Sequence, residues 1–503
     1  MSLNLREKKI LAMLFVLFVL ALILRIYQLV ILKKPEVPVY GGTYKEISFG
    51  EVTNFNPFFA TSRAEKDVSR ILFLNLVDFN DKGEIKGTLL DKFDLLGTEG
   101  QIVFKKNLYW HDGEPVTMDD FIFTVNAFKK VKALSLWGQN WEKIEIKKVS
   151  KEKAVLTYPE GALSAKILRF PVLPSHLLSD KDVTKIQGFN FNLNPVGNGP
   201  YKFRNIQRLN TGEIVVNLDQ FNKFPEKSYL ASIQITVEPS IGLAFSKYKT
   251  SPFSGLAQMP LEEAMKFKDR KAILRYIELP QYTAIFYNLK NQKLQDLETR
   301  KELDQSIDRR KIYQELSLVK PTALPLPAGA KEIKTYFKLN ETKKILAPKK
   351  LNLELAFVDQ FIYRKTAENL ANTWDKAGVK IKLVPMDEYS LSQKLITKNF
   401  DLVLWGETIG QDWLLDRWYS SSNLNFSSFV SAEVDSQLAQ VASKDAKIAI
   451  AELIRDSYPA SFLYSVPYIW SSRNLKGASL SLPGEEPTDR FKELTKWYLS
   501  VPK

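Results

Sequence analysis

The side chains that carry most enzymatic chemistry are scarce in this 503-residue chain. It has no cysteine and only two histidines, His111 and His176. The sequence therefore excludes thiolate catalysis, disulfides, thiolate zinc sites and a histidine-rich metal site. No Gly-x-Ser-x-Gly motif of a serine hydrolase occurs. We predict no metal, no cofactor and no enzyme, although plentiful acids leave a paired-carboxylate hydrolase of the cell envelope as a distant alternative.

Acidic and aromatic side chains are the remaining groups that could do chemistry. Residues 405–412 follow a predicted strand, FDLVLW, and include Trp405, Glu407 and Asp412, with Trp413 next along the chain. Because binding groups in α/β lobes gather at the carboxyl ends of strands, we predict that this stretch lines a ligand site. Either carboxylate would supply the negative charge that a desolvated ligand amine needs. Core packing of the tryptophans and capping by the acids are the competing interpretations.

The N-terminus carries a long apolar segment. Residues 10–24 form an unbroken apolar run, and after Arg25 the sequence IYQLVIL continues to Leu32. As a helix this stretch would rise about 34 Å, enough to cross a bilayer core of about 30 Å. We predict a cytoplasmic stub and signal-anchor helix over residues 1–34 and a spacer over 35–41. A cleaved signal peptide is the alternative, but no small-x-small cleavage site follows the run.

This anchor predicts the location of the rest of the chain. Cations precede the apolar run and should stay cytoplasmic, so the remainder should lie outside the cell membrane, in the periplasm or at the cell surface. No second apolar run of membrane length occurs. We therefore expect a single-pass protein with a soluble, monomeric ectodomain.

The net charge of +14 raises the question of a nucleic-acid partner. The first 34 residues contribute +5, which leaves +9 over the rest of the chain. The lysines of that remainder are spread out, and no dense basic stretch occurs. Because nucleic-acid grooves concentrate basic residues, we predict a solvated surface and no nucleic-acid partner.

The chain after the spacer has a mixed α and β pattern. Stretches rich in β-branched and aromatic residues predict strands, and apolar spacings of three and four predict helices between them. This alternation favours an α/β fold. The predicted helices are residues 118–128, 297–316, 362–377, 434–441 and 447–458, and the predicted strands begin near Thr43, Gln101, Lys153, Glu213, Ser232, Ala284, Lys380 and Phe400.

Five motifs follow one another in an order typical of one family. They are a GGTYKEISFG strand with an Asn56-Pro57 turn, then FKKNLYWHDGEPVTMDDFIFT, NPVGNGPYKF, a strand ending FYNL before a helix with an Asp-Arg pair, and EVDSQLAQVA. In this order they resemble the family 5 extracellular solute-binding proteins, the receptors of oligopeptide, dipeptide and nickel ABC importers. The resemblance covers nearly the whole chain after the spacer.

The resemblance implies both architecture and partners. It predicts a large, two-lobed α/β fold of the type II periplasmic-binding-protein kind: lobe 1 at 42–280 with a subdomain inserted at about 60–195, lobe 2 at 281–472, and a return to lobe 1 at 473–503. It implies capture of a peptide or similar small solute between the lobes and delivery to ABC transporter permease subunits. Use of the same fold as a non-transport peptide sensor stays open.

The resemblance also places the ligand. Peptide-binding members carry an acid after the strand that FDLVLW matches, and the matching position here is Thr408, so this sequence departs from the pattern there. Aromatic residues beside the Asn56-Pro57 turn are further candidates. The residues predicted to bind ligand are Phe55, Asn56, Phe58, Trp405, Glu407, Thr408, Asp412 and Trp413.

The motif residues have structural interpretations as well. Thr117 is a plausible N-cap before acids that favour a helix N-terminus, and Gly113 suits a turn that requires positive φ. Arg300 and Asp308 are expected to form surface or interlobe ion pairs. The motifs therefore predict the fold more directly than they predict the ligand site.

Overall fold

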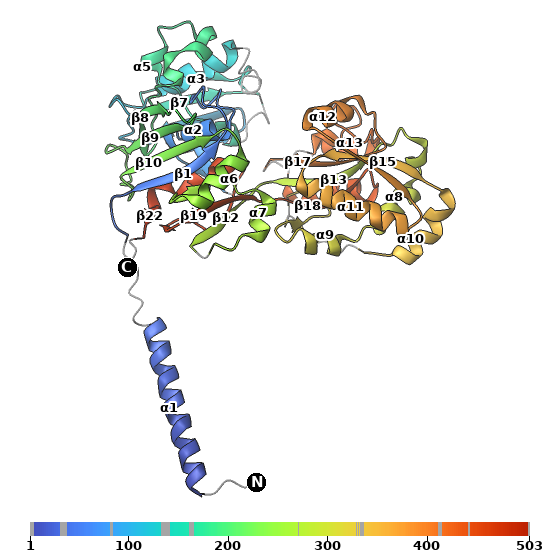
Figure 1. The fold of residues 1–503 in the computed structure, drawn as a ribbon. Coiled ribbons are helices and arrows are strands. Elements are labelled where there is room, and N and C mark those ends of the chain that lie inside the picture. Colours follow the sequence, from blue (N-terminus) through green and yellow to red (C-terminus); the bar gives the residue numbers. More distant parts are fainter. Residues whose placement is uncertain are drawn as a thin grey trace.

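The chain forms two lobes and an N-terminal helix that Figure 1 draws apart from them. The mixed α/β pattern predicted from the sequence is confirmed. The computed structural model describes residues 5–30, 38–80, 84–131, 141–159, 165–269, 271–327, 329, 331, 336–410, 415–440 and 443–500.

Lobe 1 is built on an eight-stranded sheet in the order β21-β12-β19-β11-β1-β10-β9-β8. Alternate residues of β1 face opposite sides, so Tyr44 packs in one core cluster and Ile47 in another, against α2 and α6 respectively. Both faces of the central strand are therefore buried. The elements are β1 (Thr43–Phe49), α2 (Arg63–Leu72), β8 (Tyr201–Arg208), β9 (Ile214–Gln220), β10 (Ser232–Glu238), α6 (Ile241–Thr250), β11 (Gly255–Leu256), α7 (Leu261–Lys266), β12 (Ala272–Glu278), β19 (Tyr468–Arg473), β21 (Ser481–Pro483) and the 3-10 helix η8 (Pro487–Lys496).

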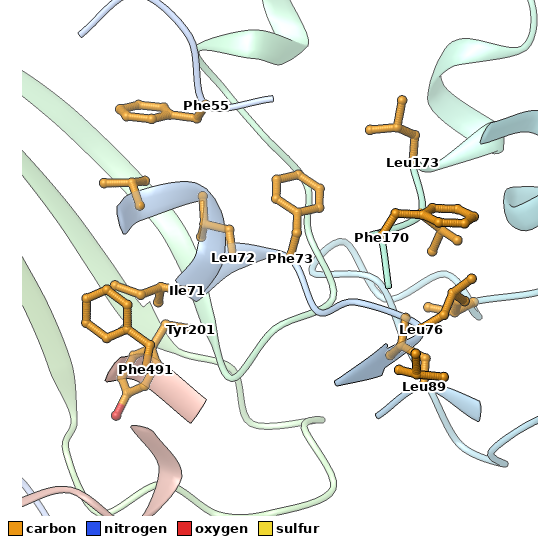
Figure 2. Packing of buried hydrophobic residues seen from close by; sticks show 14 of the residues in the cluster. Phe55, Ile71, Leu72, Phe73, Leu76, Leu89, Phe170, Leu173, Tyr201 and Phe491 are labelled. Carbon is orange, nitrogen blue, oxygen red and sulfur yellow. The ribbon is translucent and has the colours of Figure 1, made fainter. Parts of the chain in front are cut away.

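The predicted inserted subdomain lies on lobe 1 and shares its core. Figure 2 shows the packing passing from Phe55, Ile71 and Tyr201 through Phe73 to Phe170, all in one cluster of buried residues. The subdomain is consequently fixed to lobe 1 by apolar burial. Its elements are β2 (Val77–Phe79), β3 (Ile85–Gly87), β4 (Leu90–Leu96), β5 (Glu99–Phe104), α3 (Met118–Lys130), β6 (Glu145–Lys148), β7 (Lys153–Thr157) and α5 (Ser175–Leu178).

Lobe 2 is built on a six-stranded sheet in the order β14-β18-β13-β17-β15-β16. Strand β15 runs parallel to β16 and β17, whereas β13 runs antiparallel to β17 and β18. The elements are β13 (Gln281–Tyr287), α8 (Leu297–Gln305), α9 (Arg309–Glu315), β14 (Lys320–Pro321), α10 (Leu339–Leu346), β15 (Asn352–Val358), α11 (Phe361–Lys376), β16 (Lys380–Met386), α12 (Glu388–Thr397), β17 (Leu402–Thr408), α13 (Ala432–Leu438), α14 (Lys444–Asp456) and β18 (Ala460–Ser465).

Two short crossings join the lobes. Strand β12 of lobe 1 leads into β13 of lobe 2 through Leu279-Pro280, beside the predicted boundary at residue 280. Strand β18 of lobe 2 leads back into β19 of lobe 1 through Val466-Pro467. The predicted boundary at residue 472 is therefore wrong, because β19 pairs with β11 and β12 in the lobe 1 sheet. The residue pattern that predicts a strand does not show which sheet that strand joins.

The helix predicted over residues 297–316 is two helices, α8 and α9. Asp308 caps the second by accepting a hydrogen bond from the backbone N–H of Lys311 at 3.1 Å. Buried Arg300 donates to the carbonyl oxygens of Leu294 at 2.8 Å and Tyr458 at 2.8 Å. The expected ion pairs of Arg300 and Asp308 are thus replaced by capping interactions inside lobe 2.

The N-terminal apolar run lies in helix α1 (Leu5–Val30). Between Ile10 and Leu24 most of the large apolar side chains are about half exposed or more, with Ile10 at 56% and Leu24 at 62%. Among the described residues, no helix combines the length and the apolar character needed to cross a membrane.

Candidate functional site

The carboxyl end of β17 lies at the crossing between the lobes. Its last residue, Thr408, pairs with Gln281, the first residue of lobe 2 after the crossing. The next backbone N–H, from Ile409, donates to the carbonyl oxygen of Pro280 at 2.9 Å. The segment that sequence analysis selected for ligand binding therefore begins where lobe 2 meets lobe 1.

Glu407 is buried at this end of β17, with 5% of its side chain exposed. It forms an ion pair with Arg417 and accepts a hydrogen bond from the Tyr282 hydroxyl. Burial raises the pKa of Tyr282, so this hydroxyl stays a donor. The carboxylate charge is compensated inside lobe 2, and it is not an open anion awaiting a ligand amine.

Arg417, the cation paired with Glu407, has a side-chain donor that no acceptor satisfies. Arg417 Nε is buried and has no hydrogen-bond partner among the described residues. Burial also lowers the pKa of Arg417. Unmatched buried donors cost free energy, so this corner of lobe 2 favours the approach of an acceptor group.

The other predicted residues of this segment differ in position. Trp405 is half-buried and packs against the lobe 2 cores, whereas Thr408 is exposed at the end of the sheet. Asp412 and Trp413 lie outside the described residues. The structure thus brings Trp405, Glu407 and Thr408 together beside the crossing.

Two of the three predicted residues of lobe 1 lie in its interior, and Phe58 is half-buried. Phe55 and Asn56 are fully buried, with the Phe55 ring 6.0 Å from that of Phe203. The Asn56 side chain accepts from the Phe58 N–H at 3.1 Å and donates to Asn192 at 3.2 Å. Phe58 packs edge-on against another ring. In this conformation, Phe55 and Asn56 stabilise a turn and offer no surface to a ligand.

A second set of charged residues, not selected from the sequence, lies on the lobe 1 side. Tyr468 follows the second crossing directly, and the Arg63 guanidinium lies 5.7 Å from the centre of its ring. The Tyr468 hydroxyl donates to the carbonyl oxygen of Ala257, and burial raises its pKa to about 12. Arg63 Nε lies 3.2 Å from Asp67 Oδ1 in an ion pair, whereas the buried Nη2 lacks a hydrogen-bond partner in the described structure. No local spacing marks these residues, because the chain brings them together from distant segments.

Behind them lies a fully buried ion network. Arg490 Nη2 lies 2.7 Å from Glu46 Oε1 and 2.7 Å from Asp67 Oδ2, and the three side chains are at most 1% exposed. The two carboxylates raise the pKa of Arg490 against the opposing effect of burial. Since a buried charge requires a partner, this network ties β1, α2 and η8 together.

The motif around His111 forms part of the fold. The ring Nε1–H of Trp110 donates to Asp120 at 3.1 Å, and the carboxylate of Asp120 completes a capping box with Thr117. The His111 ring accepts from the Gly197 N–H at 3.1 Å, and burial lowers its pKa to about 4. The structural interpretation of these residues is therefore confirmed. Within the described ranges, no group of three or more His, Cys, Asp or Glu residues could hold a metal ion.

Two lobes, each on its own sheet and joined by two short crossings, define the class of two-lobed solute-binding proteins. The description "Bacterial extracellular solute-binding proteins, family 5 Middle" belongs to the family model that matches residues 97–426. The chain belongs to this family, as its motifs predicted.

Relatives and solved structures agree with this assignment. The oligopeptide-binding protein AppA of Bacillus subtilis is 27% identical over 288 residues, 56% of this chain and 52% of AppA, so the match spans about half of that relative. The dipeptide-binding protein of Escherichia coli is 22% identical over 67% of this chain and 70% of its own.

The fold matches known structures over most of its length. The substrate-binding protein CtaP of Listeria monocytogenes has a TM-score of 0.80 at 21% identity, covering 92% of this chain and 99% of CtaP. The structure of Bacillus subtilis AppA in complex with a nonapeptide has a TM-score of 0.67 at 20% identity, covering 92% and 100%. The two-lobed prediction is confirmed by this similarity of fold.

Proposed function

We propose that this protein is an extracytoplasmic receptor that captures a peptide or similar small solute between its lobes. It delivers the solute to ABC transporter permease subunits and performs no chemistry on it. The observation that carries the proposal is the pair of two-residue crossings between separate sheets in a chain of this family. Crossings this short allow the lobes to hinge while each core stays intact.

Ligand binding would shift the hinge by adding contacts that only the closed state has. Two polar contacts already join segments at the crossings: the Lys320 ammonium with Glu278, and the Gln281 side chain with the carbonyl oxygen of Val466. Both contacts involve residues in or next to the crossings, so they would act on the hinge itself.

The ligand site is proposed to lie beyond the end of β17. An extended peptide can be held by its backbone N–H and C=O groups, with side chains in tolerant, wet pockets. Because Glu407 is already paired with Arg417, Asp412 is the better candidate for the acid that meets a ligand amine. The unmatched Arg417 Nε donor favours a ligand carbonyl or carboxylate nearby.

The receptor is proposed to be held at the outer face of the cell membrane by its N-terminal segment, as a single-pass monomer. Support comes from the apolar run at residues 10–24, the cations before it, and the exposure of its side chains along α1. N-terminal sequencing of membrane-extracted protein tests this location. A mature protein that begins beyond Leu32 would contradict it.

The ligand itself can be identified by mass spectrometry of the full-length protein, purified in detergent and then denatured. We expect peptides or a chemically similar solute at close to one equivalent. Calorimetry with the recovered ligand should show reversible binding, and chromatography should return that ligand unchanged. Turnover of the ligand, or a preparation that binds no peptide-like solute from a peptide library, would overturn the proposal.

A further inference from the structure

A cavity of about 320 Å³ lies in lobe 1, away from the crossings. Its wall comes from the end of α2, from β2 and β3 of the subdomain, from the loop at residues 224–226, and from η8 in the C-terminal return. None of the described residues that line it belongs to lobe 2. Hinge motion would therefore leave the cavity intact, and the proposed ligand site does not include it.

The wall of this cavity carries five basic and three acidic residues. Lys105 is half-buried, and its pKa is lowered first by burial and then by the positive charge of Lys86. A cation whose pKa is lowered by a neighbouring cation indicates a region of positive potential. The basic residues are Arg70, Lys86, Lys105, Lys492 and Lys496, and the acidic residues are Asp78, Glu226 and Glu493.

The most deeply buried cations share their acids. Asp78 pairs with Arg70, with Arg169 at 3.2 Å and with Lys492 at 3.6 Å. Asp489 lies 2.9 Å from Arg169, 3.4 Å from Lys492 and 3.8 Å from Arg70. Arg169 has further acid partners that do not line the cavity. Arg70 and Lys492, the two cations of this cluster that line the cavity, thus share both aspartates with each other and with Arg169.

Arg70 and Lys492 each have a donor group without a hydrogen-bond partner, although Lys492 Nζ lies within ion-pair distance of two aspartates. The Arg70 side chain is 8% exposed and Lys492 is 11% exposed. Arg70 Nη1 and Lys492 Nζ are buried and have no hydrogen-bond partner in the described part of the chain. A buried ammonium or guanidinium group gains free energy when an acceptor completes its hydrogen bonds, and an anionic acceptor gives the largest gain.

Most of the remaining wall is apolar, with Asn80, Thr88 and Thr495 as its uncharged polar residues. Ile71 and Phe491, which lie near each other in Figure 2, contribute to it from α2 and η8. Phe79 brings an aromatic ring close to the cations, with Lys492 Nζ 5.9 Å from its centre. A bare inorganic ion would leave this surface uncovered. The further apolar side chains on the wall are Leu74, Leu108, Pro200, Phe224, Pro225 and Leu494.

We propose that this cavity is a second binding site, for a small organic anion with an apolar body and a carboxylate or phosphate group. The anionic group accepts from Arg70 Nη1 and Lys492 Nζ, and the body packs against Phe79, Leu74 and Phe491. The site does not involve the interlobe ligand, so a result for or against it leaves the proposed transport function unaffected.

Fluorine NMR of the full-length protein in lipid nanodiscs tests the site, with 4-(trifluoromethyl)benzoate as the probe. We expect saturable binding, and at least tenfold weaker binding of the uncharged 4-(trifluoromethyl)benzamide. In a second experiment, phenyl phosphate and benzoate compete with the bound probe. Stronger displacement by phenyl phosphate indicates that the ligand carries a phosphate group, and stronger displacement by benzoate indicates a carboxylate.

Four variants locate the binding. Lys492→Gln should weaken probe binding at least tenfold, and Leu74→Trp should abolish it by filling the cavity while keeping every charge. Lys86→Gln removes an exposed cation at the wall without risk to the core and should weaken binding about threefold. Lys147→Gln, an equally exposed lysine on β6 outside the cavity, is the matched control and should bind normally. Equal binding of benzoate and benzamide, or unchanged binding by Leu74→Trp and Lys86→Gln, would overturn the proposal.

Discussion

The two lobes differ in how their buried charged side chains are arranged and covered. In lobe 1, Arg490 and its two carboxylates are almost completely covered and join residues more than 400 positions apart. In lobe 2, Glu407 meets a single cation, Arg417, next to the crossing. Each arginine keeps a buried Nε without a partner among the described residues, but Arg417 is 16% exposed whereas Arg490 is fully covered. The first arrangement suits a body that must remain rigid, and the second suits a surface that must still accept a ligand.

The largest effect is expected from breaking the lobe 1 network. Arg490→Met should lower the free energy of unfolding by roughly 3–5 kcal/mol, because it leaves Glu46 buried without a cation and Asp67 with Arg63 alone. Denaturant unfolding followed by circular dichroism measures this. The matched control is Arg364→Met, which removes the largely exposed Arg364–Asp359 pair and should cost less than about 1 kcal/mol. Equal losses in both variants would show that burial of the network does not matter.

The next largest effect concerns the ligand side of lobe 2. Asp412→Asn should weaken binding of an amine-bearing peptide by about 30-fold or more, since a desolvated ammonium group loses its partner. Glu407→Gln should instead act mainly on lobe 2 stability, because its partner Arg417 belongs to the protein. Calorimetry and denaturant unfolding of both variants separate the two effects. If Glu407→Gln loses affinity and Asp412→Asn does not, the roles are reversed.

A smaller effect is expected from pH. His111 has a pKa of about 4 in the folded protein, whereas an unfolded histidine titrates near 6.5. Between these values the unfolded chain binds more protons, so stability is full above about pH 6.5 and falls as the pH drops towards 4. For this half-buried ring we expect a loss of about 1–3 kcal/mol. Unfolding of wild type and His111→Gln at pH 7 and pH 4.5 measures it, and the same slope in both proteins would rule out His111.

The smallest effect is expected at the hinge. Lys320 and Glu278 form an ion pair between the lobes, but both side chains are more than 40% exposed. Lys320→Met should therefore change the free energy of unfolding by less than about 1 kcal/mol, and the difference should shrink at high salt. Denaturant unfolding at low and high salt provides the measurement. A loss as large as that of Arg490→Met would mean that the lobes do not move independently.

Local signals determined much of the secondary structure. The strands near Thr43, Ser232 and Phe400 appear where their β-branched and aromatic residues placed them. The Thr117 cap and the positive φ of Gly113 and Gly378 follow from nearby residues alone. The order of five motifs was enough to assign the family.

Tertiary structure decided the lobe to which β19 belongs, the partners of Arg300, and whether the candidate site residues are buried, paired or exposed. Phe55 and Asn56 lie beside an asparagine-proline turn that, in sequence, is equally suited to a ligand wall or a core. The sequence around Glu407 is the same whether its carboxylate is open to a ligand or paired with Arg417. These outcomes depend on contacts between segments distant in the chain, such as Glu46 and Arg490. Local propensity carries no information about such contacts, because their energy exists only after the segments have packed together.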